Sequence, residues 1–309
     1  MALVLAFGIG ASPVLAWGPE GHRIVARIAA AHLSPNAAAG VRMLLQADPL
    51  SKRDFKSKSK TSPSEIAKAM ADVANWADVV KNSTNTQEWH FLDLASSDQK
   101  AEIPSRCPAG ECLTEKVKAM APNLNTGASL PHTPHPFTAT EQLKFVIHFM
   151  GDLHQPLHAA TNADAGGNCL RTAGFGASEL HAVWDGGMLR KVLLKNTNET
   201  ALAKTLDMRF AGTFASIANV TDLDDMALES HLVAFQASYG PILASLPSPE
   251  PRPFLKMTPS QCATMAADFF KIQPHPKLSM LYSQTTFDTV GQQLATGGYR
   301  LAALLNAAF

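Results

Sequence analysis

Apolar residues recur at intervals of three and four along most of the chain, while segments that alternate apolar and polar residues are scarce. The first spacing gathers apolar side chains on one face of a helix. The pattern therefore predicts an all-α fold, with helices at residues 20–33, 35–47, 63–81, 139–154, 178–194, 222–245, 258–271 and 285–306. In the fifth of these, Ser178 is a candidate helix cap and Gly186 a candidate helix stop.

The segments between these helices do not look like domain linkers. They include a basic run, Ser51 to Lys60, and two proline-rich stretches at residues 121–136 and 246–253. Candidate metal ligands lie on both sides of the first two, which favours a single domain built around one site. A run of like charge is usually a solvated surface, and we interpret the basic run in this way; the alternative is a guide for a polynucleotide backbone.

Charge narrows the ways in which the chain could bind an anionic partner. The 309 residues carry 26 Lys and Arg against 26 Asp and Glu, so the formal net charge is zero. A bulk attraction to phosphates is therefore excluded. A nucleic-acid partner would have to be held by local charge or by metal.

The first sixteen residues, MALVLAFGIGASPVLA, are apolar and end in a small-residue pattern, with Val14 and Ala16 at the positions that signal peptidase reads. The segment is too short to span a bilayer comfortably. We predict a signal peptide at 1–16, a mature domain at 17–309, and a secreted or periplasmic protein without a membrane anchor. The segment lacks the basic residues that begin a standard signal, so the alternative is a buried terminus.

Export would permit disulfide bonds. Because only a short loop separates Cys107 from Cys112, we favour that pair, which leaves Cys169 with Cys262. The alternatives are four unpaired thiols or a zinc tetrad. The tetrad is less attractive, since the chain has no CxxC motif.

The densest chemical signal is FVIHFMGDLHQPLH, from Phe145 to His158. His148 and Asp152 are four residues apart and so share one helix face, and Pro156 should end that helix soon afterwards. The chain can then turn and bring His158 back to the same space. One such pair also occurs on ordinary helix surfaces, so by itself it is weak evidence for a metal site.

Further candidate ligands lie on both sides of this segment. ELHAVWDGG repeats the spacing of four with His181 and Asp185, and two such pairs together favour metal binding. NWADVV and EWHFLDL place Asp78 and His90 among apolar neighbours, where a carboxylate needs a cation or donors. A backbone carbonyl could equally satisfy a buried histidine.

WGPEGH places Trp17 five residues before His22. Cleavage after Ala16 would give Trp17 a free amine, which together with its carbonyl oxygen could chelate a metal, and such an amine is readily deprotonated at neutral pH. The alternative is a turn that buries Trp17 in the core.

These motifs, in this order, resemble the zinc-dependent single-strand-specific nucleases of the S1/P1 type. The resemblance spans nearly the whole mature chain, through WGPEGH, NWAD, WHFLDL, HFMGDLHQPLH, GGN, LHAVWD and GGYRLAALLN. It implies a helical fold with three zinc ions. One zinc would be held by Asp78, His90, His148 and Asp152, a second by His158, His181 and Asp185, and a third by Trp17, His22 and Asp152. Asp152 would then bridge two zincs.

The resemblance also implies the reaction and the substrate contacts. Zinc lowers the pKa of a bound water to about 7 and stabilises charge on the leaving oxygen, so no side-chain base is required. Cleavage of the bond between phosphorus and the 3′ oxygen of single-stranded DNA or RNA would give 5′-phosphorylated nucleotides, and 3′-nucleotides are further candidate substrates. Lys81 is a candidate phosphate contact, and Phe91, Asp93 and Asn168 are candidate contacts to a base.

The chain departs from the family pattern at Gly186 and Gly187, where other members carry side chains, so the base preference is left open. A zinc-dependent phospholipase C is the nearest alternative, because it shares the fold and the initial Trp. The Trp17–His22 spacing and Asp185 as final ligand favour the nuclease. A secreted zinc-binding protein without catalysis is a further alternative, and we expect a monomer.

Overall fold

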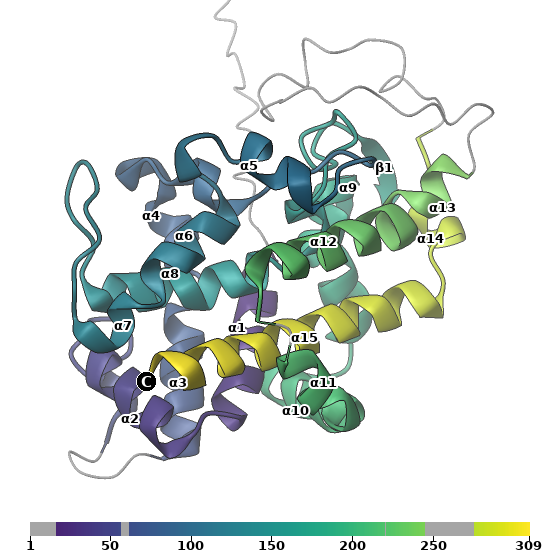
Figure 1. The fold of residues 1–309 in the computed structure, drawn as a ribbon. Helices are drawn as coiled ribbons and strands as arrows, with labels where there is room; N and C mark the ends of the chain where they lie inside the picture. The colour runs from purple at the N-terminus through teal and green to yellow at the C-terminus, as the bar shows by residue number, and fades with distance from the viewer. Residues whose placement is uncertain (1–16, 57–61, 220, 245–274) are drawn as a thin grey trace, which may run out of the picture.

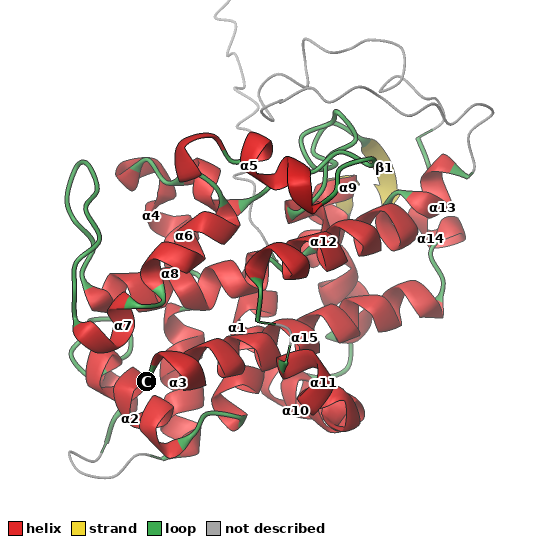
Figure 2. Ribbon diagram, in the orientation of Figure 1, coloured by secondary structure: helices red, strands yellow, loops and turns green. Residues whose placement is uncertain are grey.

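The computed structural model describes residues 17–56, 62–219, 221–244 and 275–309, and within these residues the chain forms one helical domain. Figure 2 shows mainly helices joined by loops, with one small hairpin among the described residues. Its strands, β1 (Arg171–Gly174) and β2 (Ala177–Glu179), pair antiparallel. The expected all-α fold is confirmed.

The first helix lies at the centre of the packing. α1 (Pro19–Ala31) contacts α3 (Pro63–Val73), α10 (Glu199–Phe210) and the C-terminal helix α15 (Gln284–Ala308). Ile24, Val25 and Ile28 on its buried face meet Leu294 and Leu301 in the same core. Because that face also carries His22, the packing that buries α1 fixes a candidate ligand.

A second central helix, α8 (Ala139–Asp152), carries His148 and Asp152. Thr138 caps it: the hydroxyl accepts from Glu141 N, and the Glu141 side chain accepts from Thr138 N, which forms a capping box. Nearly all of its side chains are buried, since α1, α4 (Trp76–Thr84), α6 (Leu113–Met120), α7 (Asn123–Thr126) and α15 surround it. In Figure 1, α15 runs across much of the molecule, whereas α8 and α12 (Leu223–Val233) are shorter.

Several predicted helices agree with the structure and others need correction. The first, second, fourth and last correspond to α1, α2 (Pro35–Leu45), α8 and α15. The third is broken at Ala74 and Asn75 into α3 and α4. The helix predicted at 222–245 consists of α12, a π-helical turn at Ala234–Ser238 and α13 (Gly240–Leu243). The helix predicted at 258–271 lies outside the described residues.

The segment predicted as a helix at 178–194 begins differently. Ser178 belongs to β2, and helix starts only with α9 (Leu180–Ala182). It continues as π-helical turns at Val183–Gly187 and Leu189–Leu193, so Gly186 does not stop it and both cap assignments were wrong. Other helices were not predicted from the sequence: α6, α10 and the short helices α5 (Ile103–Arg106), α7, α11 (Phe214–Ala218) and α14 (Leu278–Leu281).

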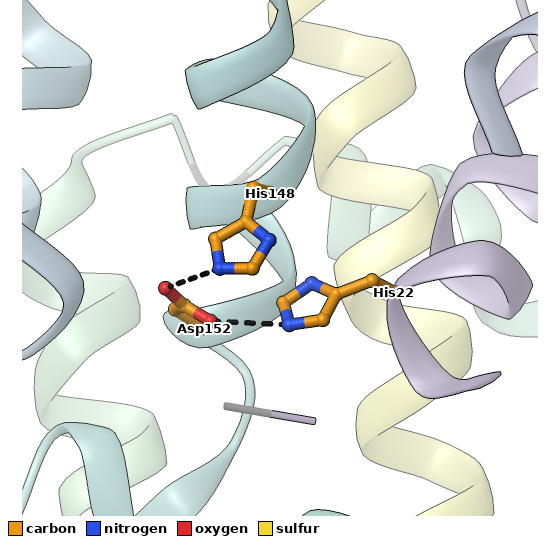
Figure 3. Close-up of side chains that lie close together, drawn as sticks. All are labelled: His22, His148 and Asp152. Atoms are coloured by element: carbon orange, nitrogen blue, oxygen red, sulfur yellow. Dashed lines mark ion pairs between the residues drawn. The ribbon is translucent and has the colours of Figure 1, made fainter. Parts of the chain in front are cut away.

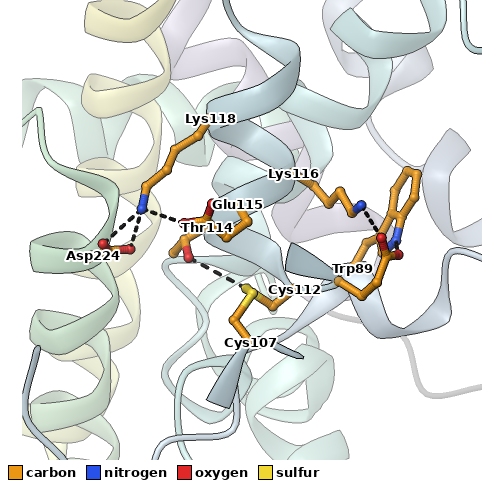
Figure 4. Close-up of a disulfide and its surroundings, with 9 residues drawn as sticks. Trp89, Cys107, Cys112, Thr114, Glu115, Lys116, Lys118 and Asp224 are labelled. Atoms are coloured by element: carbon orange, nitrogen blue, oxygen red, sulfur yellow. Dashed lines mark hydrogen bonds and ion pairs between the residues drawn. A yellow bond between two sulfur atoms is a disulfide. The ribbon is translucent and has the colours of Figure 1, made fainter. Parts of the chain in front are cut away.

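The favoured disulfide is present between Cys107 and Cys112, beside α6 (Figure 4). Next to it, Lys116 pairs with Glu111, which also accepts a hydrogen bond from the indole of Trp89. Trp89 precedes His90, so this corner of the fold supports a candidate ligand. The second expected pair involves Cys262, which lies outside the described residues. No helix in the described part of the chain is long and apolar enough to cross a membrane.

Candidate metal centre

All the histidine and aspartate side chains predicted as ligands are buried and gathered in one region. They come from α1, α4, a short 3-10 helix at Gln87–His90, α8, a second one at Pro156–His158, α9 and the π-helical turn. They form three groups whose candidate ligand atoms lie within 4.8 Å of one another: His22, His148 and Asp152; Asp78, His90 and His148; and His158, His181 and Asp185.

Asp152 joins two of these groups through its two carboxylate oxygens. Oδ1 lies 3.4 Å from Nε2 of His22, and Oδ2 lies 3.3 Å from Nε2 of His148 (Figure 3). Oδ2 is also 3.1 Å from Nδ1 of His90. Such an arrangement can bridge two metal ions.

Asp78 completes the group around His90. Its Oδ1 lies 3.7 Å from His90 Nδ1, and its Oδ2 lies 3.8 Å from His148 Nε2. Lys81, one turn along α4, donates to Asp78 Oδ1 at 2.8 Å, and its side chain is only 13% exposed. Lys81 is therefore held at the edge of this group.

The third group is separate in sequence but adjacent in space. Nε2 of His158 lies 3.1 Å from Nε2 of His181, and His181 Nε2 is 3.4 Å from Asp185 Oδ2. Gln155 donates to the other oxygen, Asp185 Oδ1, at 2.5 Å. The turn after α8 does bring His158 back, as the Pro156 position predicted.

Backbone carbonyls fix the orientation of three imidazoles. Nδ1 lies 2.7 Å from a carbonyl oxygen in each case: His148 with Ala74, His158 with His90, and His181 with Gly166. Such a bond places the proton on Nδ1 and leaves Nε2 as an acceptor that faces the cluster. This is the tautomer that a metal site requires.

The pKa shifts of the buried histidines and aspartates indicate a site suited to a cation. Burial lowers the pKa of His22, His90 and His158 well below the usual 6.5, and the neighbouring histidines and Lys81 lower it further. Burial also lowers the pKa of His181 to about 4. Burial raises the pKa of Asp152 and Asp185 well above 3.8. The histidines are therefore neutral at pH 7. The two buried carboxylates have too little positive charge near them to offset the cost of burying their negative charge.

Unsatisfied atoms test whether metal fits here. Among the described residues, neither ring nitrogen of His22 has a hydrogen-bond partner, and the same holds for His90 Nε2, Asp78 Oδ2 and Asp152 Oδ1. Buried polar atoms rarely remain unpaired. Neutral imidazoles and carboxylates are common ligands of divalent metals, zinc among them, so these donors fit such ions.

Trp17 is fully buried at the start of the described chain, five residues before His22. A Cβ on Gly21 would lie 2.7 Å from Trp17 Cβ, so glycine permits the close turn. Gly18 N donates to Asp185 O at 2.6 Å, which ties this segment to the third group.

The candidate substrate contacts differ in how far they are buried. Phe91 and Asn168 are half-buried, while Asp93 is buried. Asn168 Nδ2 donates to Ala165 O at 2.7 Å, and Leu92 N donates to His158 O at 2.7 Å. Phe91 and Asp93 therefore flank a residue that is bonded to a candidate ligand.

One structural role was missed by sequence reasoning. Asp164 is buried and accepts from Tyr239 OH at 2.8 Å and from Gly167 N at 3.0 Å, so it shapes the loop that carries Gly166. The only sequence signal was its place two residues before GGN.

His154 was not predicted as a ligand. Its Nε2 lies 3.2 Å from Nη1 of Arg300.

Comparison with known proteins agrees with this geometry. The family model for S1/P1 nuclease matches residues 17–309. Endonuclease 4 of Arabidopsis thaliana is 27% identical over 96% of this chain and 90% of its own length. Nuclease P1 of Penicillium citrinum is 24% identical over 94% of this chain and 97% of its own, and nuclease S1 of Aspergillus oryzae is 28% identical over 56% and 54%. A buried His/Asp cluster suited to metal and a family match over nearly the whole chain lead to one conclusion: the chain belongs to the S1/P1 nuclease family of enzymes that hydrolyse phosphodiester bonds.

Proposed function

We propose that this protein is a zinc-dependent endonuclease that hydrolyses single-stranded DNA and RNA at the bond between phosphorus and the 3′ oxygen, and that also removes 3′-phosphates from nucleotides. The observation that carries the proposal is the position of Asp152, because its two carboxylate oxygens lie beside different histidines, Oδ1 beside His22 and Oδ2 beside His148. The names of the relatives, nucleases and endonucleases, agree with this substrate class.

Three zinc ions are proposed. Asp78, His90, His148 and Asp152 would hold the first, and His158, His181 and Asp185 the second. The amine and carbonyl of Trp17, with His22 and Asp152 Oδ1, would hold the third. Bound zinc would lower the pKa of a water and stabilise negative charge on phosphate oxygens.

Other groups of the chain would orient the metal ligands and contact the substrate phosphate. Ala74, His90 and Gly166 carbonyls keep three imidazoles in the ligand tautomer. Gln155 orients Asp185. Lys81, which is held beside Asp78, would contact the phosphate as a point charge.

Preference for single strands is proposed to come from a base stacked on Phe91, with Asp93 and Asn168 contacting its edge. Phe91 is half-buried and follows a ligand directly, which supports this role. A stacked base contributes about 1 to 3 kcal/mol and is unavailable when paired in a duplex.

Export and processing are proposed with the function. Cleavage after Ala16 would create the Trp17 amine, and the family match begins at that residue. The mature protein is proposed to be a monomer outside the cytoplasm.

One experiment tests the proposal against its alternatives. Purified protein beginning at Trp17 is given single-stranded DNA, RNA, 3′-AMP and phosphatidylcholine, with and without a chelator, and its zinc content is measured by mass spectrometry. Chelator-sensitive hydrolysis of the nucleic acids supports the proposal. Turnover of the lipid alone, or none with zinc fully loaded, rejects it.

A further inference from the structure

We propose that Arg190 binds a phosphate adjacent to the scissile one, so that the site favours longer strands over dinucleotides. The inference rests on the proposed nuclease function and adds a specificity residue to it. Arg190 lies on the π-helical turn Leu189–Leu193, five residues after the candidate ligand Asp185.

The guanidinium occupies space that Gly186 leaves open. A Cβ on Gly186 would lie 2.3 Å from Nη1 and 2.6 Å from Cζ of Arg190. Any side chain at this position would displace the guanidinium. The glycine that departs from the family pattern thus makes room for a cation beside the metal centre.

A second glycine borders the same position. A Cβ on Gly18 would lie 3.1 Å from Arg190 Nη1 and 3.5 Å from the carbonyl oxygen of Asp185. Gly18 also donates its backbone hydrogen bond to that oxygen. Arg190 therefore covers the junction between the start of the mature chain and the last candidate ligand.

Arg190 is available to an incoming anion. Its side chain is 50% exposed, and it pairs with Glu20 at 3.3 Å, a long contact between partly exposed groups. Such surface pairs are weak, whereas a guanidinium can bind phosphate through two hydrogen bonds. A phosphate can therefore replace Glu20.

Two different cations lie beside candidate ligands of the cluster. Lys81 is held against Asp78, and Arg190 lies against Gly186, the residue that follows Asp185. With the scissile phosphate at the metal centre, the next phosphate along an extended strand can meet Arg190. A dinucleoside monophosphate has no second phosphate and gains nothing from this contact.

The test compares Arg190→Gln with the wild-type enzyme on decathymidylate and on a thymidine dinucleoside monophosphate. We expect KM for the decamer to rise about tenfold, with little change for the dinucleotide. The salt dependence of log kcat/KM on the decamer should become less steep by about 0.7. Equal effects on both substrates, or none on either, would overturn the inference.

Two further variants separate a phosphate contact from a general loss of charge. Lys191→Gln removes the neighbouring cation, which lies by Gly176 of the hairpin, and should leave both KM values unchanged. Glu20→Gln removes the competing carboxylate and should lower KM for the decamer by about twofold. It should have no effect once Arg190 is replaced.

Binding gives a readout that does not depend on turnover. Anisotropy of a labelled phosphorothioate decamer, whose modified linkages slow hydrolysis, should show the same loss of affinity in Arg190→Gln. A protein that cleaves neither substrate but shows this loss would reject the proposed reaction and retain the inference. Unchanged affinity would reject the inference itself.

Discussion

Nδ1 of His181 lies 2.7 Å from the carbonyl oxygen of Gly166, so a loop backbone sets the direction of a candidate ligand. Gly166 has φ +61°, and a Cβ there would lie 2.5 Å from Leu157 O. Gly166→Ala should move this carbonyl and lower kcat by about 10- to 100-fold. Steady-state kinetics at saturating zinc would measure the loss.

Gly127→Ala is the matched control for that variant. Gly127 also has positive φ, +72°, but nothing lies within 4 Å of a Cβ built there. The substitution should cost about 1 kcal/mol of unfolding free energy through backbone strain alone and leave kcat unchanged. If both alanine variants reduced kcat equally, the orienting role of Gly166 would be wrong.

Replacing Asp152 with asparagine should remove the bridge between two metal positions. An amide retains the shape of the side chain but not its charge. We expect the zinc content to fall from about three to about one per chain and activity to fall at least a hundredfold. Mass spectrometry of the native protein gives the zinc content.

Asp98→Asn serves as the control for that substitution, because Asp98 is a buried carboxylate that pairs with Arg106 and belongs to none of the three groups. It should lower stability and leave the zinc content unchanged. A full zinc complement in Asp152→Asn would contradict the bridging role.

Processing should control activity, because an uncleaved chain would lack the Trp17 amine as a ligand. A protein that retains Ala16 should bind one zinc fewer and lose most of its turnover. The protein that begins at Trp17 should bind all three zinc ions and be fully active. Mass spectrometry identifies the first residue, and a chelator titration counts the zinc. Full activity in a chain that keeps residues 1–16 would require a different third site.

Acid should destabilise the fold through His231, which is buried and lies 2.8 Å from Ala95 O through Nε2. Burial lowers the pKa of His231 below 6.5. The unfolded chain therefore binds the proton more readily, so this contribution to stability is present above about pH 6.5 and is lost as the pH falls towards the folded-state pKa.

His231→Gln keeps a donor for the carbonyl but cannot titrate. Its free energy of unfolding, measured in urea from about pH 8 to pH 5, should fall less steeply than that of the wild type, by up to about 1.4 kcal/mol per pH unit. Comparison with the wild type cancels the titration of other groups. Parallel curves would show that His231 does not contribute.

The sequence identified the side chains that the structure gathers as candidate ligands, but not the backbone groups that orient them. His148 and Asp152 follow from a spacing of four on a helix. Ala74 could not be predicted as a partner of His148, because apolar residues continue evenly through 63–81. The helix nevertheless ends at Val73, with Ala74 as its C-cap, and a carbonyl at the end of a helix lacks a partner within the helix. His148 supplies that partner.

The spacing of apolar residues also did not predict the kind of helix that follows Leu180. His181 and Asp185 suggest an α-helix, but a π-helical turn begins at Val183. Such turns insert one extra residue and often occur at functional sites. Here the turn contains Asp185, Gly186 and Gly187. Apolar periodicity does not distinguish the two kinds of turn over so few residues.

The candidate ligands extend in sequence from His22 to Asp185 and come from both ends of this interval as well as its middle. Metal ions bound here would act as cross-links between segments that are far apart along the chain. A proteolytic fragment that lacked either end of the interval would be unable to assemble the centre. Enzymatic activity would therefore report the integrity of more than half of the polypeptide.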